Sequence, residues 1–215
     1  MTYSEKEEHY NSYSHYLGIG FSIIFGGNLI IQKAIPSQNG WAIFSDVVFV
    51  VFMTLMYMAS STYHAEKTES IKLKRRKFDH AAIYTQIAGS YTPFTLIVLR
   101  LNGAWGWSLF GIIWAAAIFG VSLSFMNKKK GSKLETICYV AMGWVVVVAF
   151  KPLIDSLSAT NSMPVLYWLI GGGLFYTVGA ILYRFKQIPY THAIFHLFVL
   201  GGSICHFIAI WKIKI

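Results

Sequence analysis

The residues best suited to chemistry in this sequence are histidines and an aspartate placed at the ends of apolar stretches. His64 ends one stretch and Asp79 begins the next, while His192 and His196 begin the last one. Two histidines four residues apart in a helix project from one face on adjacent turns. That spacing suits two nitrogen ligands of one tetrahedral zinc ion. The pattern therefore indicates a metal site, provided that the stretches are helices whose ends meet.

Such a site would have a catalytic rather than a structural ligand set. Three imidazoles leave one position open on zinc, and a water bound there can ionise near neutral pH. Asp79 would hold or deprotonate that water, or orient a ligand from outside. Ser60, one turn before His64, would bond the water or a substrate oxygen. The alternative interpretation is that these histidines only meet headgroups or water at the membrane surface.

Three other histidines are predicted to lie outside the metal site. His206 is ten residues beyond His196, which is about 15 Å along a helix, so the two cannot share one metal ion. We expect His206 to be a hydrogen-bond partner between helices. His9 and His15 precede the first apolar stretch and are expected at the membrane surface.

A polar stripe accompanies the predicted site. Asp79, Gln86 and Ser90 are separated by seven and four residues and therefore share one face of a helix. A polar face in an apolar helix should look into the interior of a bundle. It would either line a cavity that leads to the metal or form a buried hydrogen-bond network that fixes helix packing.

Composition identifies the elements that must position these residues. Of the 215 residues, 55% are hydrophobic and 13% are charged, whereas soluble domains carry about 25% charged residues. Seven apolar stretches recur, and about 20 residues suffice to cross a bilayer. We therefore predict an all-α integral membrane protein, a seven-transmembrane helix bundle forming a single domain over residues 1–215, with a short N-terminal segment of about residues 1–15. The approximate spans are 16–35, 42–64, 79–99, 105–126, 134–150, 164–185 and 191–211.

The basic residues predict an orientation. The net charge of +9 invites a nucleic-acid partner, but basic residues in membrane proteins gather in cytoplasmic loops, so we expect no nucleic acid. The predicted spans place 13 of the 18 basic residues on the side of the N-terminus. This asymmetry predicts a cytoplasmic N-terminus, a C-terminus outside, and location in the cell membrane. It also places the four candidate site residues toward the cytoplasmic face.

At these residues the chain resembles the hemolysin III family, within the larger family of progestin and adipoQ receptors. The resemblance covers nearly the whole chain and is carried by long motifs in the family's order. They are EHYNSYSHYLG at 8–18, SSTYH at 60–64, DHAAIYTQIAGSYTPFTL at 79–96, GW at 143–144, GLFYTVGAILY at 173–183 and HAIFHLFVLGGSICHF at 192–207.

The resemblance implies a seven-helix fold with a cytoplasmic N-terminus and a zinc ion held by His64, His192 and His196. It also places the family's aspartate on Asp79 and its serine on Ser60, around a zinc-bound water. In the receptor branch, and in the similar alkaline ceramidases, this site is linked to hydrolysis of lipid amides such as ceramide.

These observations lead us to expect a membrane-embedded, zinc-dependent, hydrolase-like protein acting on lipid amides. Its partners would be membrane lipids, including a substrate that enters the bundle from the bilayer. Two alternatives stay open: a pore-forming, cytolytic or membrane-stress protein, and a zinc-stabilised sensor without turnover. The sequence indicates neither the substrate nor the oligomeric state.

Overall fold

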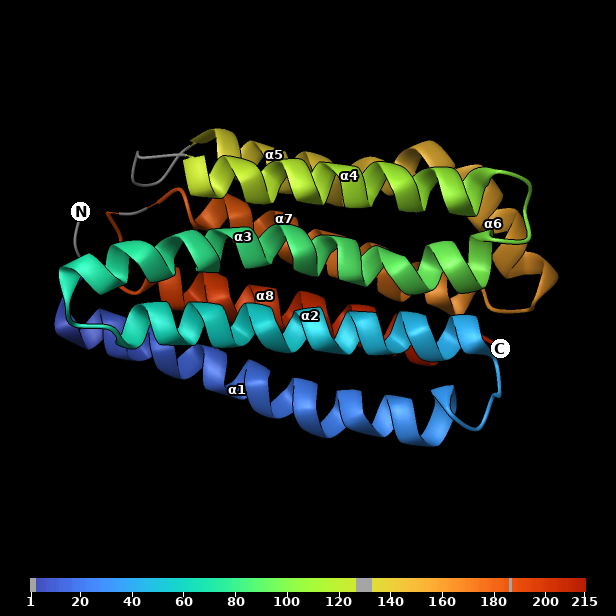
Figure 1. The fold of residues 1–215 in the computed structure, drawn as a ribbon, viewed down its shortest axis with the longest axis horizontal. Helices are drawn as coiled ribbons and strands as arrows, with labels where there is room; N and C mark the ends of the chain where they lie inside the picture. The colour runs from blue at the N-terminus through green and yellow to red at the C-terminus, as the bar shows by residue number, and fades with distance from the viewer. Residues whose placement is uncertain (1–2, 127–132, 186) are drawn as a thin grey trace.

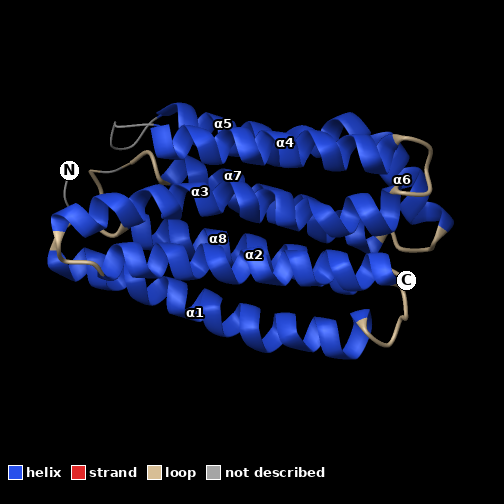
Figure 2. Ribbon diagram, in the orientation of Figure 1, coloured by secondary structure: helices blue, strands red, loops and turns tan. Residues whose placement is uncertain are grey.

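The computed structural model describes residues 3–126, 133–185 and 187–215, and within these ranges the chain is helical and without strands (Figure 2). The elements in order are α1 (Glu5–Leu29), the π-helical turn η1 (Ile30–Ala34), α2 (Gly40–Ala65), α3 (Glu69–Pro93), the π-helical η2 (Phe94–Leu99), α4 (Trp105–Met126), α5 (Lys133–Trp144), the 3-10 segment η3 (Val145–Ala149), α6 (Phe150–Ala159), α7 (Pro164–Leu182) and α8 (Thr191–Trp211). The predicted all-α class is confirmed.

The helices lie side by side along one long axis (Figure 1). Helix α2 packs against α1 and α3, α3 packs against α4, and α7 packs against α8. Contact between α1 and α8 brings the first and last helices together. The start of α1 and the end of α8 lie at opposite ends of the bundle (Figure 1).

Six helical segments are long and apolar enough to cross a membrane, so the chain is a multi-pass integral membrane protein. The remaining predicted span, 79–99, falls on α3 and η2. This segment is not among the six. Polar side chains within it, such as Gln86, Ser90 and Thr92, lower its mean hydropathy. The total of seven crossings and the orientation of the termini stay predictions.

The distribution of side chains is that of a protein dissolved in lipid. Large apolar side chains such as Ile24 and Ile118 are each 67% exposed on the outside of the bundle. Polar side chains such as Ser22, Asp46 and Thr92 are fully buried inside it. Polar groups are kept out of the hydrocarbon because lipid offers them no hydrogen-bond partners. Ser22 and Thr92 each bond to another helix, to Thr54 and Trp114.

Helix α1 begins eleven residues before the predicted span and takes in most of the segment that the sequence assigned to 1–15. Ser4 caps it: its hydroxyl accepts from the Glu7 backbone N–H, and the Glu7 carboxylate accepts from the Ser4 N–H. This reciprocal pair satisfies two backbone donors at the helix start. The polar residues Asn11 and His15 share a buried face four residues apart, so the helix extends the core beyond its apolar part.

Helix α3 also begins earlier than predicted, at Glu69 instead of Asp79. Lysine and arginine are good helix formers, so the charged segment winds into the first turns of α3 instead of forming a loop. The Glu66 carboxylate accepts a hydrogen bond from the Thr68 backbone N–H and pairs with Arg75. The Thr68 N–H and, to a smaller extent, Arg75 hold the pKa of this carboxyl below its usual range. These contacts fix the short turn between α2 and α3.

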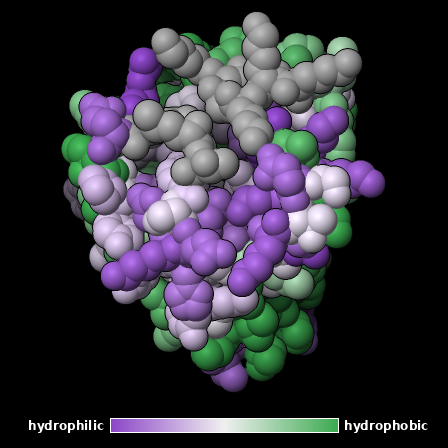
Figure 3. Space-filling view, turned by 90° about the vertical axis from the view of Figure 1, so that its left-hand side faces the viewer, coloured by the Kyte–Doolittle hydropathy of each residue, from purple (hydrophilic) through white to green (hydrophobic). Residues whose placement is uncertain are grey.

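We call the end of the bundle that carries these charges the basic end, defined by five residues of α3. Figure 3 faces this end and shows hydrophilic side chains gathered across its middle, with apolar side chains below them and at the edges. The sequence places Lys128, Lys129, Lys130 and Lys186 there as well, but these four lie outside the described residues. The defining residues are Lys72, Lys74, Arg75, Arg76 and Lys77.

The predicted fifth span is interrupted where four valines follow one another. Val145–Ala149 is 3-10 helix between α5 and α6, and the apolar segment runs on to Ala159. Branched side chains restrict their own rotamers in a helix, so a run of them weakens it. The Tyr91 hydroxyl on α3 accepts from the Val146 N–H at 2.9 Å and donates to the Gly143 carbonyl at 2.7 Å. It therefore satisfies backbone groups that the break leaves open.

Glycines allow the interior helices to approach closely. A Cβ at Gly120 of α4 would lie 2.3 Å from the Tyr84 ring, and one at Gly172 of α7 would lie 2.2 Å from the His206 ring. No such contact is sterically allowed, so each ring lies against bare backbone. Small residues serve this purpose in membrane helices.

Candidate metal centre

Three histidines from two helices converge at the basic end. His64 lies in the last turn of α2, and His192 and His196 lie on adjacent turns at the start of α8. One ligand nitrogen from each lies within 4.8 Å of the others. The Nε2 atoms of His64 and His192 are 3.0 Å apart. Nitrogen ligands of a tetrahedral zinc ion, at 2.0–2.1 Å from the metal, are about 3.3 Å apart, so the geometry fits such an ion.

An acidic side chain from α1 fixes the orientation of His64. The Glu8 carboxylate lies 2.6 Å from His64 Nδ1, and its other oxygen accepts from Lys72 Nζ at 2.8 Å. A carboxylate only accepts, so Nδ1 of His64 carries the proton and Nε2 keeps its lone pair for a metal. A carboxylate behind a histidine is the usual support of a zinc ligand.

His196 is oriented in the same way by neutral groups of α1. Its Nδ1 lies 3.1 Å from the Asn11 carbonyl oxygen and 2.9 Å from Ser14 Oγ. The Ser14 hydroxyl donates to the same carbonyl, so both oxygens accept from His196. Nδ1 therefore carries the proton, and Nε2 of His196 is also free to bind a metal. Two of the three rings are thus held in the tautomer that a metal requires.

Aromatic side chains cover the triad from the end of the bundle. The Tyr3 ring lies 5.0 Å from the ring of His192 and 6.5 Å from that of His64. Burial raises the pKa of the Tyr3 hydroxyl well above its ordinary value, so the phenol stays neutral. The Glu7 carboxylate accepts from the Tyr190 N–H at 3.2 Å and joins the start of α1 to that of α8. These contacts cover part of the triad: His64 and His196 are buried, and His192 is half-buried.

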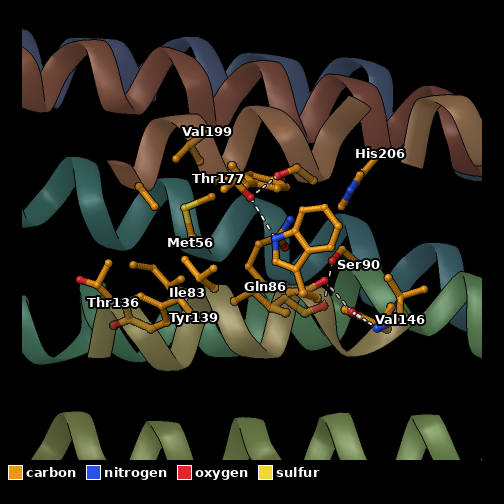
Figure 4. Close-up of a pocket in the computed structure, with 18 of the residues that line it drawn as sticks. Met56, Ile83, Gln86, Ser90, Thr136, Tyr139, Val146, Thr177, Val199 and His206 are labelled. Atoms are coloured by element: carbon orange, nitrogen blue, oxygen red, sulfur yellow. Dashed lines mark hydrogen bonds between the residues drawn. The ribbon is translucent and has the colours of Figure 1, made fainter. Parts of the chain in front are cut away.

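A cavity of about 220 Å³ extends from the triad into the bundle. Figure 4 shows part of its lining, including Gln86 and His206. His192 and His196 line it, together with Ser60 and Asp79. Asp79 is 9% exposed and Ser60 is 4% exposed. Beyond them the wall is mostly apolar or aromatic and continues to Leu99 and other residues near the opposite end. Lining residues far from the triad include Leu109, Phe150 and Leu153.

The family model described as "Haemolysin-III related" matches residues 3–207. The chain belongs to the haemolysin III family. "Hemolysin-3" of Bacillus cereus is 39% identical over 212 residues, covering 98% of this chain and 93% of that protein. The "Hemolysin-3 homolog" of Bacillus subtilis is 39% identical over 205 residues, covering 95% and 93%. The human "Monocyte to macrophage differentiation factor" is 27% identical over 208 residues, covering 94% and 82%, and supports the wider resemblance to the progestin and adipoQ receptors.

In this haemolysin III chain the structure brings together the three histidines that the sequence singled out. His206 is not part of the cluster, as the helical rise predicts. Asp79 and Ser60 share the cavity with the histidines, but Asp79 is not one of the clustered ligand groups. Their roles in the chemistry stay predictions.

One prediction about the other histidines is wrong. His15 was expected at the membrane surface, yet it is 2% exposed and its ring centre lies 3.7 Å from that of His196. It is buried because α1 begins early enough to carry it into the core. His206 is predicted to bond between helices, and the Leu169 carbonyl of the neighbouring α7 lies beside its ring. The contact does not have the geometry of a normal hydrogen bond, so this role stays a prediction.

Sequence reasoning missed the supporting residues of α1. Glu8, Asn11 and His15 are spaced three and four residues apart, which is a helical face leading into the first apolar stretch. That spacing was the available indication, and it was overlooked because the segment before residue 16 was not treated as helix. The partners of His196 are more than 180 positions away in the chain.

Replacing Glu8 with glutamine should weaken metal binding about tenfold to a hundredfold, because the charge behind His64 is lost while the shape is kept. The measurement is a zinc titration against a competing chelator. Glu5→Gln is the matched control, since Glu5 is exposed in the first turn of the same helix. Equal zinc affinity in Glu8→Gln and the wild type would show that Glu8 only ties α1 to α2 and α3.

Proposed function

We propose that this haemolysin III protein is a zinc-dependent hydrolase of lipid amides that acts inside the membrane. One observation carries the proposal: two histidines of a metal-ligand triad line a largely apolar cavity together with a carboxylate and a hydroxyl. Three ligands leave a metal site open to a substrate, as in catalytic zinc sites. A purely structural zinc site is closed by four protein ligands.

The ligand set is suited to zinc. Neutral imidazole nitrogens favour zinc, copper, iron or nickel over magnesium or calcium, which take oxygen ligands. His64, His192 and His196 would hold the ion. When bound, zinc supplies a Lewis acid that polarises a carbonyl and makes a water molecule more acidic.

The residues of the chain divide the remaining work. Asp79 accepts a proton from the attacking water and delivers it to the amine nitrogen as the carbon–nitrogen bond breaks. Ser60 donates a hydrogen bond to the substrate oxygen. The products are a fatty acid and a free amine, so water is the only co-reactant. The apolar wall receives the acyl chain and keeps bulk water away from the reacting carbonyl.

The names of the two Bacillus relatives favour a second candidate, a membrane-lysing pore. A conducting path needs polar groups along its whole length, because ions are costly in hydrocarbon. Apart from the buried His206 and the tyrosines, the ionisable residues of the described cavity are Asp79, His80, Glu135 and the histidines of the triad end, while its far end is lined by Leu99, Leu109 and Leu153. This arrangement supports an acyl-chain site more strongly than an ion path.

The proposal is tested with purified protein in lipid nanodiscs and a panel of N-acyl amides, with fatty acid and amine measured by mass spectrometry. We expect both products in equal amounts, with a rate that falls at least about a hundredfold when a chelator removes the metal and returns with zinc but not magnesium. Bound zinc without any product would indicate a sensor. Histidine-independent conductance across reconstituted bilayers would indicate a pore.

A further inference from the structure

Two polar side chains face the cavity well away from the triad. Gln86 of α3 is 5% exposed and His206 of α8 is 9% exposed, and both line the cavity wall (Figure 4). Neither amide atom of Gln86 has a hydrogen-bond partner among the described residues. Both ring nitrogens of His206 also lack a hydrogen bond of normal geometry to such a residue.

Other polar groups on the same wall are satisfied within the protein. The Ser90 hydroxyl donates to the Ile87 carbonyl, and the Thr177 hydroxyl donates to the Gly173 carbonyl. The Trp144 indole N–H donates to Thr177 Oγ1 at 3.0 Å. These polar groups of the cavity wall therefore have hydrogen-bond partners within the protein. Away from the triad, Gln86 and His206 lack such partners by normal hydrogen-bond geometry among the described residues, so a molecule in the cavity could supply them.

A buried polar group without a partner is destabilising, so such groups are rare unless they serve a ligand. Replacing an unpartnered polar group with an apolar one of similar shape is neutral or stabilising. His206 is nevertheless firmly placed: its ring lies against Gly172, with the ring centres of Tyr176 and Phe94 at 5.3 Å and 6.4 Å. The structure holds this polar ring at the cavity wall without giving its nitrogens a hydrogen bond of normal geometry.

Helix geometry gives the depth of the two groups. Gln86 is seven residues past Asp79, which is about 10 Å along α3, and His206 is about 15 Å past His196 along α8. The acidic residues among the described lining are Asp79 and Glu135, and this lining includes no lysine or arginine. Gln86 and a neutral His206 are therefore suited to an uncharged group. A hydroxyl both donates and accepts, as an amide and a neutral imidazole also do.

We propose that Gln86 and His206 form a subsite that hydrogen-bonds a hydroxyl on the acyl chain of the bound lipid. This inference rests on the proposed function for the placement of the lipid carbonyl at the triad. The preferred ligand is then an amide of a mid-chain hydroxylated fatty acid rather than of a plain one. The subsite acts on chain recognition and takes no part in breaking the amide bond.

The test compares two probes that differ only in this hydroxyl, octadecanamide and 10-hydroxyoctadecanamide, bound to zinc-loaded protein in nanodiscs. We expect the wild type to bind the hydroxylated probe about tenfold more tightly, the effect of one net hydrogen bond of about 1.4 kcal/mol. The preference should fall below about twofold in Gln86→Leu and His206→Phe. Gln32→Leu is the matched control, since Gln32 is exposed on η1 outside the cavity.

Equal affinity of the wild type for both probes overturns the proposal, as does a preference that survives in both cavity variants. Thermal midpoints provide a second readout. Gln86→Leu should keep or raise the midpoint, whereas a clear fall would make Gln86 a structural partner and overturn the subsite. Binding is compared in the Asp79→Asn background, which removes the proposed base, so the probes are not hydrolysed and the two proposals fail separately. If the protein prefers the hydroxylated probe but hydrolyses no amide, only the proposed enzymatic function is wrong. If hydrolysis depends on the triad but the preference is absent, only the proposed subsite is wrong.

Discussion

His196→Ala should yield a folded protein that no longer retains zinc through purification. Zinc affinities of small structural sites correspond to about 10–16 kcal/mol, so one of three or four ligands contributes about 3 kcal/mol, or more than a hundredfold in affinity. The loss should be larger than for Glu8→Gln, because a ligand is removed instead of its support. Elemental analysis of the wild type and the variant measures the zinc-to-protein ratio directly.

The matched control for this variant is His206→Ala, which removes a buried histidine from the same helix and the same cavity. It should retain zinc at the wild-type ratio, because His206 lies outside the clustered ligand nitrogens. Equal zinc content in His196→Ala and the wild type would contradict the metal site. Loss of zinc in both variants would instead show that the assay reports general unfolding of α8.

The sequence predicts the helices well where they are apolar and poorly where they leave the apolar region. Hydropathy cannot detect the first turns of α1 and α3, because both are rich in charged residues. Yet capping at Ser4 and the helix preference of lysine and arginine extend both helices to Glu5 and Glu69. The break at Val145 depends on a local run of valines and on Tyr91 from another helix. A contact with another helix, such as that of Tyr91, cannot be predicted from the residue pattern of one stretch alone.

The candidate site also has features that the sequence predicts and features that depend on contacts between distant segments. The spacing of His192 and His196, and the position of His64 at a helix end, predict a cluster that the structure confirms. The tautomers of His64 and His196 depend on contacts with α1, which are distant in the chain and require the packing to be known. The polar stripe of Asp79, Gln86 and Ser90 was open to two interpretations. The structure favours a cavity lining, since all three residues line the cavity.

The second large effect is expected for Asp79→Asn, which keeps the shape of the side chain and removes its basicity. If Asp79 moves the proton during amide hydrolysis, the rate of product release should fall by about a hundredfold to ten-thousandfold. Zinc content should be unchanged, because Asp79 is not part of the ligand cluster. The measurements are amine release by mass spectrometry and zinc by elemental analysis on the same preparation. Asp155→Asn is the matched control, since this carboxylate is exposed and pairs only locally with Lys151 at 2.7 Å.

The two measurements together separate three roles for Asp79. A slow variant with full zinc content supports proton transfer, because the metal site is intact while the chemistry has failed. A variant that has lost both zinc and activity would make Asp79 a support of the ligands, and the base would have to be sought among other cavity residues. Unchanged activity with unchanged zinc would remove Asp79 from the mechanism. In that case the burial of a carboxylate beside an apolar cavity, which costs free energy unless it is compensated, would have to be explained by packing alone.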